Sequence, residues 1–153
     1  MINRAYAKAI IYAYPMLGEI IENLEKEIKT KCYGSKFNIA PVEDQFNDIY
    51  KDVNRRYDLC ILKACIEEVA EDFKSVDREI LDFNMRICSA KILKTLPGPF
   101  YNRCWERVQD LFCWGLSEHE VDTNWLIEIV NTNAFINRYI PVEEKINLNK
   151  KGE

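Results

Sequence analysis

The chain has 153 residues, of which 48% are hydrophobic and 30% charged, and these values are ordinary for one globular domain. Five glycines and five prolines are too few for a typical all-β or low-complexity chain. The formal net charge of −4 excludes a protein whose whole surface attracts nucleic acid non-specifically.

The six cysteines indicate reduced structural thiols. No two are spaced as Cys-x-x-Cys, and the single histidine, His119, has no cysteine near it in sequence. Cys60, Cys88 and Cys104 fall at apolar helical positions, where cysteine acts as a small hydrophobe. The apolar run over residues 9–14 is too short for a secretory signal, and no stretch approaches transmembrane length. We therefore expect a cytoplasmic protein without a metal or a cofactor.

The first predicted helix starts after Asn3, a residue suited to capping, and runs through Pro15. Its apolar residues recur in steps of four and three at Tyr6, Ile10, Tyr14, Leu17, Ile21, Leu24 and Ile28. A proline removes one backbone hydrogen bond and clashes with the preceding turn, so a kink or a break is expected at Pro15. Because the spacing is close to a heptad repeat, this face packs inside a bundle or forms a homodimer seam through Ile10, Leu17, Ile21, Leu24 and Ile28.

A connection over residues 32–41 leads into one long helix, predicted over residues 42–73. That helix carries two apolar stripes. The first consists of Val42, Phe46, Ile49, Val53, Tyr57, Cys60 and Ala64. The second consists of Leu59, Leu62, Ile66, Val69 and Phe73. A helix that is apolar on two sides is expected to be central.

Shorter helices are predicted for the rest of the chain. Ser75 is a candidate cap for a helix over residues 76–87, and a helical segment over residues 90–96 follows it. Pro97-Gly98-Pro99 then starts a helix whose core stripe is Phe100, Cys104, Val108, Leu111 and Gly115. The capping-box pattern Ser117-Glu118-His119-Glu120 is expected to open the last helix.

These elements predict an all-α bundle of about five or six helices in a single domain over residues 1–141. Residues 1–73 contain the kinked helix and the long central helix, and residues 76–131 form a helix-turn-helix-like part. Residues 142–153 are predicted to be a polar tail.

Residues 86–116 are the basic part of an acidic chain, with five basic and two acidic side chains, so the remainder carries −7. A short helical segment over residues 90–96, a sharp turn at Pro97-Gly98-Pro99 and a second helix after it indicate a helix-turn-helix. In that motif the start of the second helix reads base edges, while side chains before it meet phosphates. Arginine suits guanine, asparagine suits adenine and glutamate accepts from cytosine. The predicted DNA-binding residues are Lys91, Lys94, Asn102, Arg103, Glu106 and Arg107, unless they form the polar face of an ordinary bundle helix.

The run Phe100-Tyr101-Asn102-Arg103, followed by Val108, Leu111 and Trp114-Gly115-Leu116, resembles the recognition helix of phage late-transcription regulators of the RinA/ArpU type. Tyr14-Pro15, followed by Leu17, Ile21 and Leu24, resembles their opening helix. The resemblance is loose and covers about half of the chain. It implies a helix-turn-helix similar to region four of sigma factors and a phage- or prophage-type DNA-binding regulator of transcription.

Two other classes of function stay open. The acidic total and the heptad-like stripes are typical of a helical protein-interaction module that does not bind DNA. The motifs Glu68-x-x-Glu71 and Glu79-x-x-Asp82 resemble the acidic motifs of all-α MazG-type nucleotide pyrophosphatases, in which carboxylates hold magnesium. However, Glu68 and Glu71 lie roughly opposite the second apolar stripe at about 100° per residue. An enzyme is therefore not expected.

Overall fold

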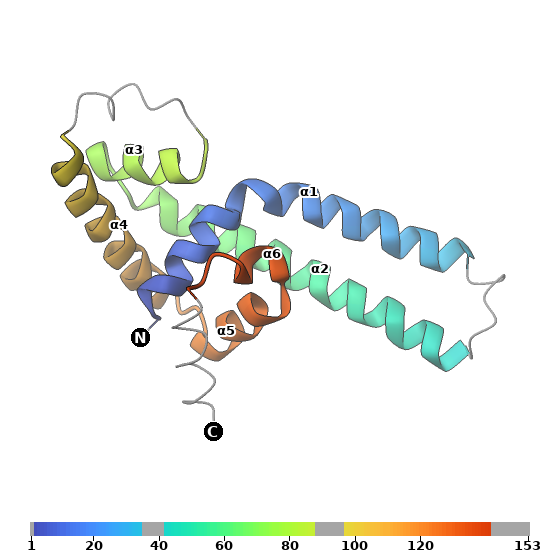
Figure 1. Ribbon diagram of the computed structural model, residues 1–153. Helices are drawn as coiled ribbons and strands as arrows, with labels where there is room; N and C mark the ends of the chain where they lie inside the picture. The colour runs from blue at the N-terminus through green and yellow to red at the C-terminus, as the bar shows by residue number, and fades with distance from the viewer. Residues whose placement is uncertain (1, 35–41, 88–96, 142–153) are drawn as a thin grey trace. The chain divides into compact units, whose positions relative to one another are not determined.

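The computed structural model describes residues 2–34, 42–87 and 97–141. In chain order its helices are α1 (Arg4–Gly34), α2 (Val42–Glu71), α3 (Ser75–Asn84), α4 (Gly98–Glu118), α5 (Thr123–Thr132) and α6 (Ala134–Asn137) (Figure 1). Every regular element in these ranges is a helix, which confirms the predicted all-α fold. None of these described helices combines the length and the apolar character needed to cross a membrane.

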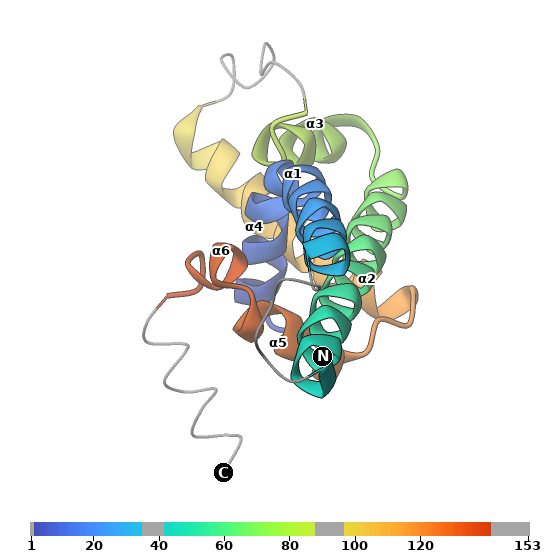
Figure 2. The same ribbon diagram turned by 90° about the vertical axis from the view of Figure 1, so that its right-hand side faces the viewer.

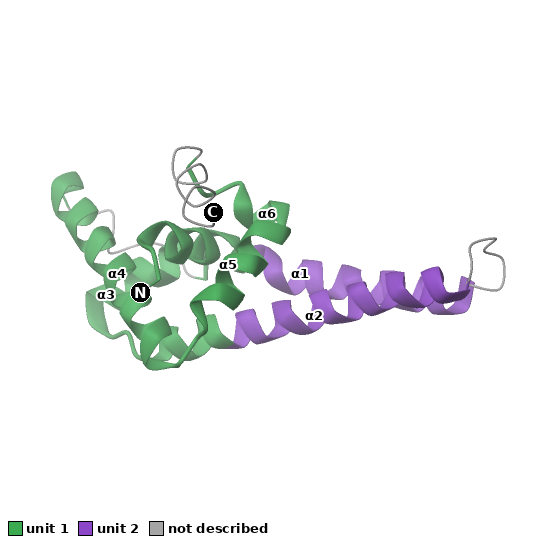
Figure 3. Ribbon diagram, turned by 90° about the horizontal axis from the view of Figure 1, so that it is seen from below, with its two compact units in different colours: residues 1–15, 65–153 green, residues 16–64 purple. Residues whose placement is uncertain are grey.

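The chain divides into two compact units (Figure 3). Unit 1 comprises Met1–Pro15 and Cys65–Glu153, and unit 2 comprises Met16–Ala64. Both α1 and α2 contribute to each unit. The division differs from the predicted parts 1–73 and 76–131, and a single domain over residues 1–141 stays a prediction.

Unit 2 is a pair of antiparallel helical segments, one from α1 and one from α2 (Figure 3). The Nζ atom of Lys31 lies 2.9 Å from the Asp48 carboxylate and 2.6 Å from the Asp52 carboxylate. Hydrogen bonds to Asp52 and Asp48 raise the pKa of Lys31. Farther along the pair, the Arg56 guanidinium lies 3.7 Å from the Glu25 carboxylate. Charged side chains therefore link the two helices at both places, beside the buried leucines of the pair, Leu17, Leu24, Leu59 and Leu62.

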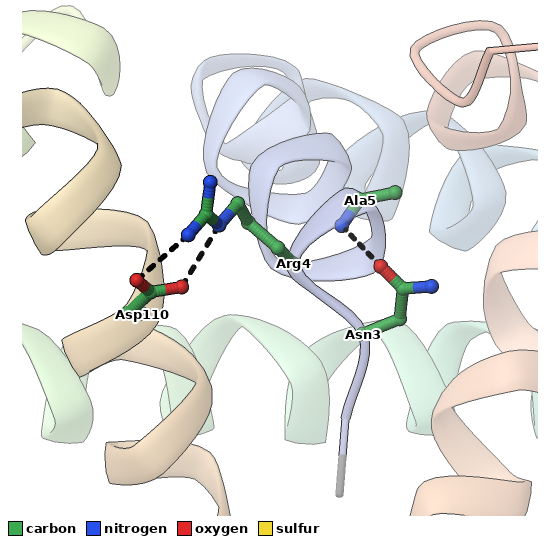
Figure 4. Close-up of polar contacts among 4 residues, drawn as sticks. All are labelled: Asn3, Arg4, Ala5 and Asp110. Atoms are coloured by element: carbon green, nitrogen blue, oxygen red, sulfur yellow. Dashed lines mark hydrogen bonds and ion pairs between the residues drawn. The ribbon is translucent and has the colours of Figure 1, made fainter. Parts of the chain in front are cut away.

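The start of α1 is fixed by two polar contacts (Figure 4). Asn3 caps the helix, as predicted, because its Oδ1 accepts from the backbone N–H of Ala5 at 2.9 Å. Arg4 donates from Nε and Nη2 to the two carboxylate oxygens of Asp110 on α4, both at 2.8 Å. These side chains are about half exposed, so the pair orients α1 on α4 more than it stabilises the fold.

The first turns of α1 are buried on almost every side. Their buried residues are mostly small or aliphatic: Ala5, Tyr6, Ala7, Ala9, Ile10, Ile11 and Ala13. α1 continues through Pro15 without a break, and the boundary between the units follows directly after that residue. Ile10, Leu17 and Leu24 of the predicted homodimer seam are also buried, while Ile21 and Ile28 are half-buried. The chain itself therefore covers three of the five seam side chains, and a homodimer through this face stays a prediction.

α3 and α4 run antiparallel in unit 1. Asn84 donates to the Tyr101 hydroxyl at 3.2 Å near one end, and Arg107 donates to Asp77 at 2.5 Å near the other. The Arg78 guanidinium donates to the carbonyl of Ala70, which holds α3 beside the end of α2. α5 and α6 pack against each other (Figure 2).

Two predicted caps are wrong. The N-cap of α3 is Lys74, and Ser75 is already the first helical residue. The pattern from Ser117 does not open a helix, because α4 continues to Glu118 and the Ser117 hydroxyl donates to the carbonyl of Cys113. α5 is capped instead by Asp122, whose side chain accepts from the N–H of Asn124 at 3.1 Å.

The buried face of α4 also differs from the predicted stripe. Phe100 and Leu111 are exposed, whereas Trp105, Phe112 and Leu116 are buried. Large aromatic side chains on the neighbouring positions have turned the helix toward them, because they remove more apolar surface from water. The segment predicted over residues 90–96 and the tail predicted over residues 142–153 lie outside the described residues.

Gly115 marks the closest approach of α4 to α2. A Cβ atom placed at Gly115 would lie 2.7 Å from Cγ1 of Val69, a distance that real side chains essentially never show. Val69 is β-branched and fully buried, so it has little freedom to move away. The packing of α4 on α2 therefore requires glycine at this position.

Replacing Gly115 by alanine is expected to destabilise the fold by about 1–3 kcal/mol relative to the control Gly18→Ala, through overpacking. Gly18 lies in α1 with open space around its Cα, so Gly18→Ala supplies the intrinsic helical gain without a clash. Denaturant unfolding measures both changes. In a Val69→Ala background the penalty should shrink, and equal stability of Gly115→Ala and Gly18→Ala would contradict the close approach.

Candidate functional site

Five large apolar side chains on α2 lie in the solvent on one face of the helix. We call this set the α2 stripe: Val42, Phe46, Tyr50, Val53 and Tyr57, which are 81%, 67%, 57%, 43% and 65% exposed. The Phe46 and Tyr50 rings stack on each other, with centroids 6.4 Å apart and planes 12° from parallel. Single exposed apolar side chains are common on proteins, but a continuous row of them marks an interaction surface.

The second predicted stripe of α2 behaves in the opposite way. Its members are all buried: Leu59, Leu62, Ile66, Val69 and Phe73. At about 100° per residue, the mean directions of the two stripes point to roughly opposite sides of the helix. The chain has therefore covered one apolar side of α2 and left the other side open.

The side of α2 that faces α1 is the polar one. Gln45, Ile49, Asp52 and Arg56 recur there at steps of four, three and four, and all are half-buried. Asp52 and Arg56 take their partners, Lys31 and Glu25, from α1. The sequence contains a signal for this pairing, because opposite charges on the two helices occur in antiparallel order. Hydrophobic periodicity alone does not reveal it.

The predicted DNA-binding residues on α4 are all exposed. Asn102, Arg103, Glu106 and Arg107 lie in its first three turns. Arg107 is engaged with Asp77 of α3 at 2.5 Å, and this hydrogen bond raises the pKa of the guanidinium. Arg103 forms no ion pair with any other residue that the structure describes. Lys91 and Lys94 lie outside the described residues, so whether the four cations share one surface stays a prediction.

Unit 1 also contains a pocket of about 380 Å³ between the end of α2, the start of α3, and α4. Phe73, Leu111 and Trp114 contribute apolar lining. Two of its three carboxylates are engaged, since Asp77 accepts from Arg107 and Asp72 lies 2.9 Å from Nε2 of His119. The charged lining of this pocket is thus partly neutralised by residues next to it.

The acidic motifs of α2 and α3 do not converge on a cation site. Glu68 and Glu71 are exposed, and Glu68 lies 3.8 Å from Nδ1 of His119. Asp82 accepts from Arg78 of its own helix at 2.9 Å. Across the described ranges, no group of three or more His, Cys, Asp or Glu side chains is arranged to hold a metal ion. The described geometry therefore gives magnesium chemistry no support.

The described cysteines are free thiols, and the pKa of two of them is raised. Burial, with a smaller effect of Asp110, raises the pKa of Cys113 to about 11. Burial also raises the pKa of Cys65, next to Glu68. Because the thiolate is the reactive form, neither residue is suited to covalent catalysis near neutral pH.

Known protein families, curated proteins and solved structures yield no match to this chain. Two surface features of the described residues are candidates for a functional site: the α2 stripe and the exposed polar start of α4.

Proposed function

We propose that the protein is a helical protein-interaction module that binds its partner through the α2 stripe. The observation that carries this proposal is the exposure of five large apolar side chains in register along about four turns of one helix. Steps of four, four, three and four residues place these side chains on one face of the helix, where a partner helix or groove can contact them together.

The energetics of covering the stripe are favourable. With about 200 Å² for each aromatic side chain, its exposed area is on the order of 500 Å². At about 25 cal/mol per Å², covering that area contributes on the order of 12 kcal/mol before the costs of association, which are of similar size. The stripe alone therefore supports a reversible complex.

A photo-crosslinking benzoylphenylalanine at Tyr50 is expected to form a covalent protein adduct in cells that express the chain, because this position contacts the partner. The same residue at Lys51, about 145° around the helix from the stripe, is the matched control and should stay unlinked. Mass spectrometry identifies the adducts. Absence of any adduct at Tyr50, or equal adducts at both positions, would contradict a docking role for the stripe.

A second candidate is the phage- or prophage-type DNA-binding regulator. What supports it is the exposure of Asn102, Arg103 and Glu106 at the start of α4, together with Arg103 being unpaired among the described residues. These types of side chain read base edges from the N-terminal turns of a helix. The ion pair of Arg107 with Asp77 and the negative net charge of the chain weigh against it.

If α4 binds DNA, fluorescence anisotropy should show association with random-sequence duplex at low salt that weakens steeply as salt rises. Arg103→Ala should then weaken binding and lower the salt dependence by about one charge, because one cation fewer contacts the phosphates. Lys26→Ala, an exposed cation on α1, is the control that changes charge equally. No binding at low salt, or an equal loss in both variants, would count against this second candidate.

A further inference from the structure

We propose that the partner on the α2 stripe is a second copy of this chain, bound antiparallel about a two-fold axis. This inference rests on the proposed function of the stripe and names its occupant. Two copies of one helix face form a closed isologous dimer when the face is complementary to itself.

The spacing of the last four members of the stripe is the same in both chain directions. From Phe46 to Tyr57 the steps are four, three and four residues, so reversing the helix reproduces the pattern. A two-fold axis between Tyr50 and Val53 then places Phe46 of one copy against Tyr57 of the other. It also places Tyr50 against Val53. A partner of unrelated sequence would not require this symmetry.

Side-chain size agrees with the antiparallel arrangement. At the centre it sets the large Tyr50 against the small Val53, so the layers on either side of the axis have equal volume. A parallel pair would set Tyr50 against Tyr50 and Val53 against Val53, which leaves one layer crowded and the next underfilled. Alternating large and small side chains is what close packing of facing helices requires.

The area is also sufficient. Two stripes that cover each other remove on the order of 1,000 Å² from solvent, counting about 200 Å² for each aromatic side chain. That figure reaches the lower bound of about 1,000 Å² for a specific interface before any flanking residues are included. A reversible dimer is therefore the expected species.

Sedimentation equilibrium of the full chain tests the proposal. The unmodified protein should reach a dimer as concentration rises, and Phe46→Glu or Tyr57→Glu should weaken dimerisation by about tenfold or more. Asn47→Glu adds the same charge on an exposed position beside the stripe and should dimerise as the unmodified chain does. Circular dichroism verifies that each variant keeps its helices.

Orientation is tested by mixing the single variants Asn47→Cys and Asn54→Cys under oxidation. The antiparallel dimer brings the same flank of both helices together and should give disulfides between residues 47 and 54, located by peptide mapping. A parallel dimer places residues 47 and 54 of the two copies on opposite flanks and would give no such disulfide. A chain that stays monomeric up to its solubility limit overturns the second-copy proposal, as does a dimer unaffected by Phe46→Glu and Tyr57→Glu. If Tyr50 crosslinks to a different protein in the monomeric case, the docking role survives without the second copy.

Discussion

The structure depends on one constraint, which is that α2 carries apolar side chains on two opposite sides. The side of Leu59, Leu62, Ile66 and Val69 is buried. In unit 2 the charged contacts of Asp52 and Arg56 fix how α2 meets α1, and they leave the α2 stripe facing solvent. An open apolar side of a helix gains free energy when another surface covers it.

The packing of unit 1 limits what α4 offers to a partner. Gly115 lets α4 approach Val69 closely, and Trp105 and Phe112 turn its aromatic side inward. On the outer side, Arg107 is held by Asp77 and Asp110 by Arg4. Pairings of this kind orient helices while they remove charge from the surface. For this reason we place the docking surface on α2 and keep nucleic-acid binding by α4 as the second candidate.

Local signals in the sequence predicted the fold class and most helix positions. Asn3 as a cap, the start of a helix at Pro97-Gly98-Pro99 and the phase of the second α2 stripe all correspond to the structure. The sequence could not tell which apolar stripe is covered, because periodicity identifies a face but not the neighbour that packs on it. The predicted capping box at Ser117 was wrong for a similar reason. The buried side of α4 extends to Leu116, so the helix continues to Glu118 and does not end before Ser117.

The most direct measurement is hydroxyl-radical footprinting of the dilute full chain, read out by mass spectrometry for each ring. If the α2 stripe is open in the single chain, Phe46, Tyr50 and Tyr57 should be oxidised at rates close to that of the exposed Trp114, after correction for intrinsic reactivity. Rates as low as those of the buried rings of Tyr6 and Phe112 would contradict the account, because the chain itself would then cover the stripe.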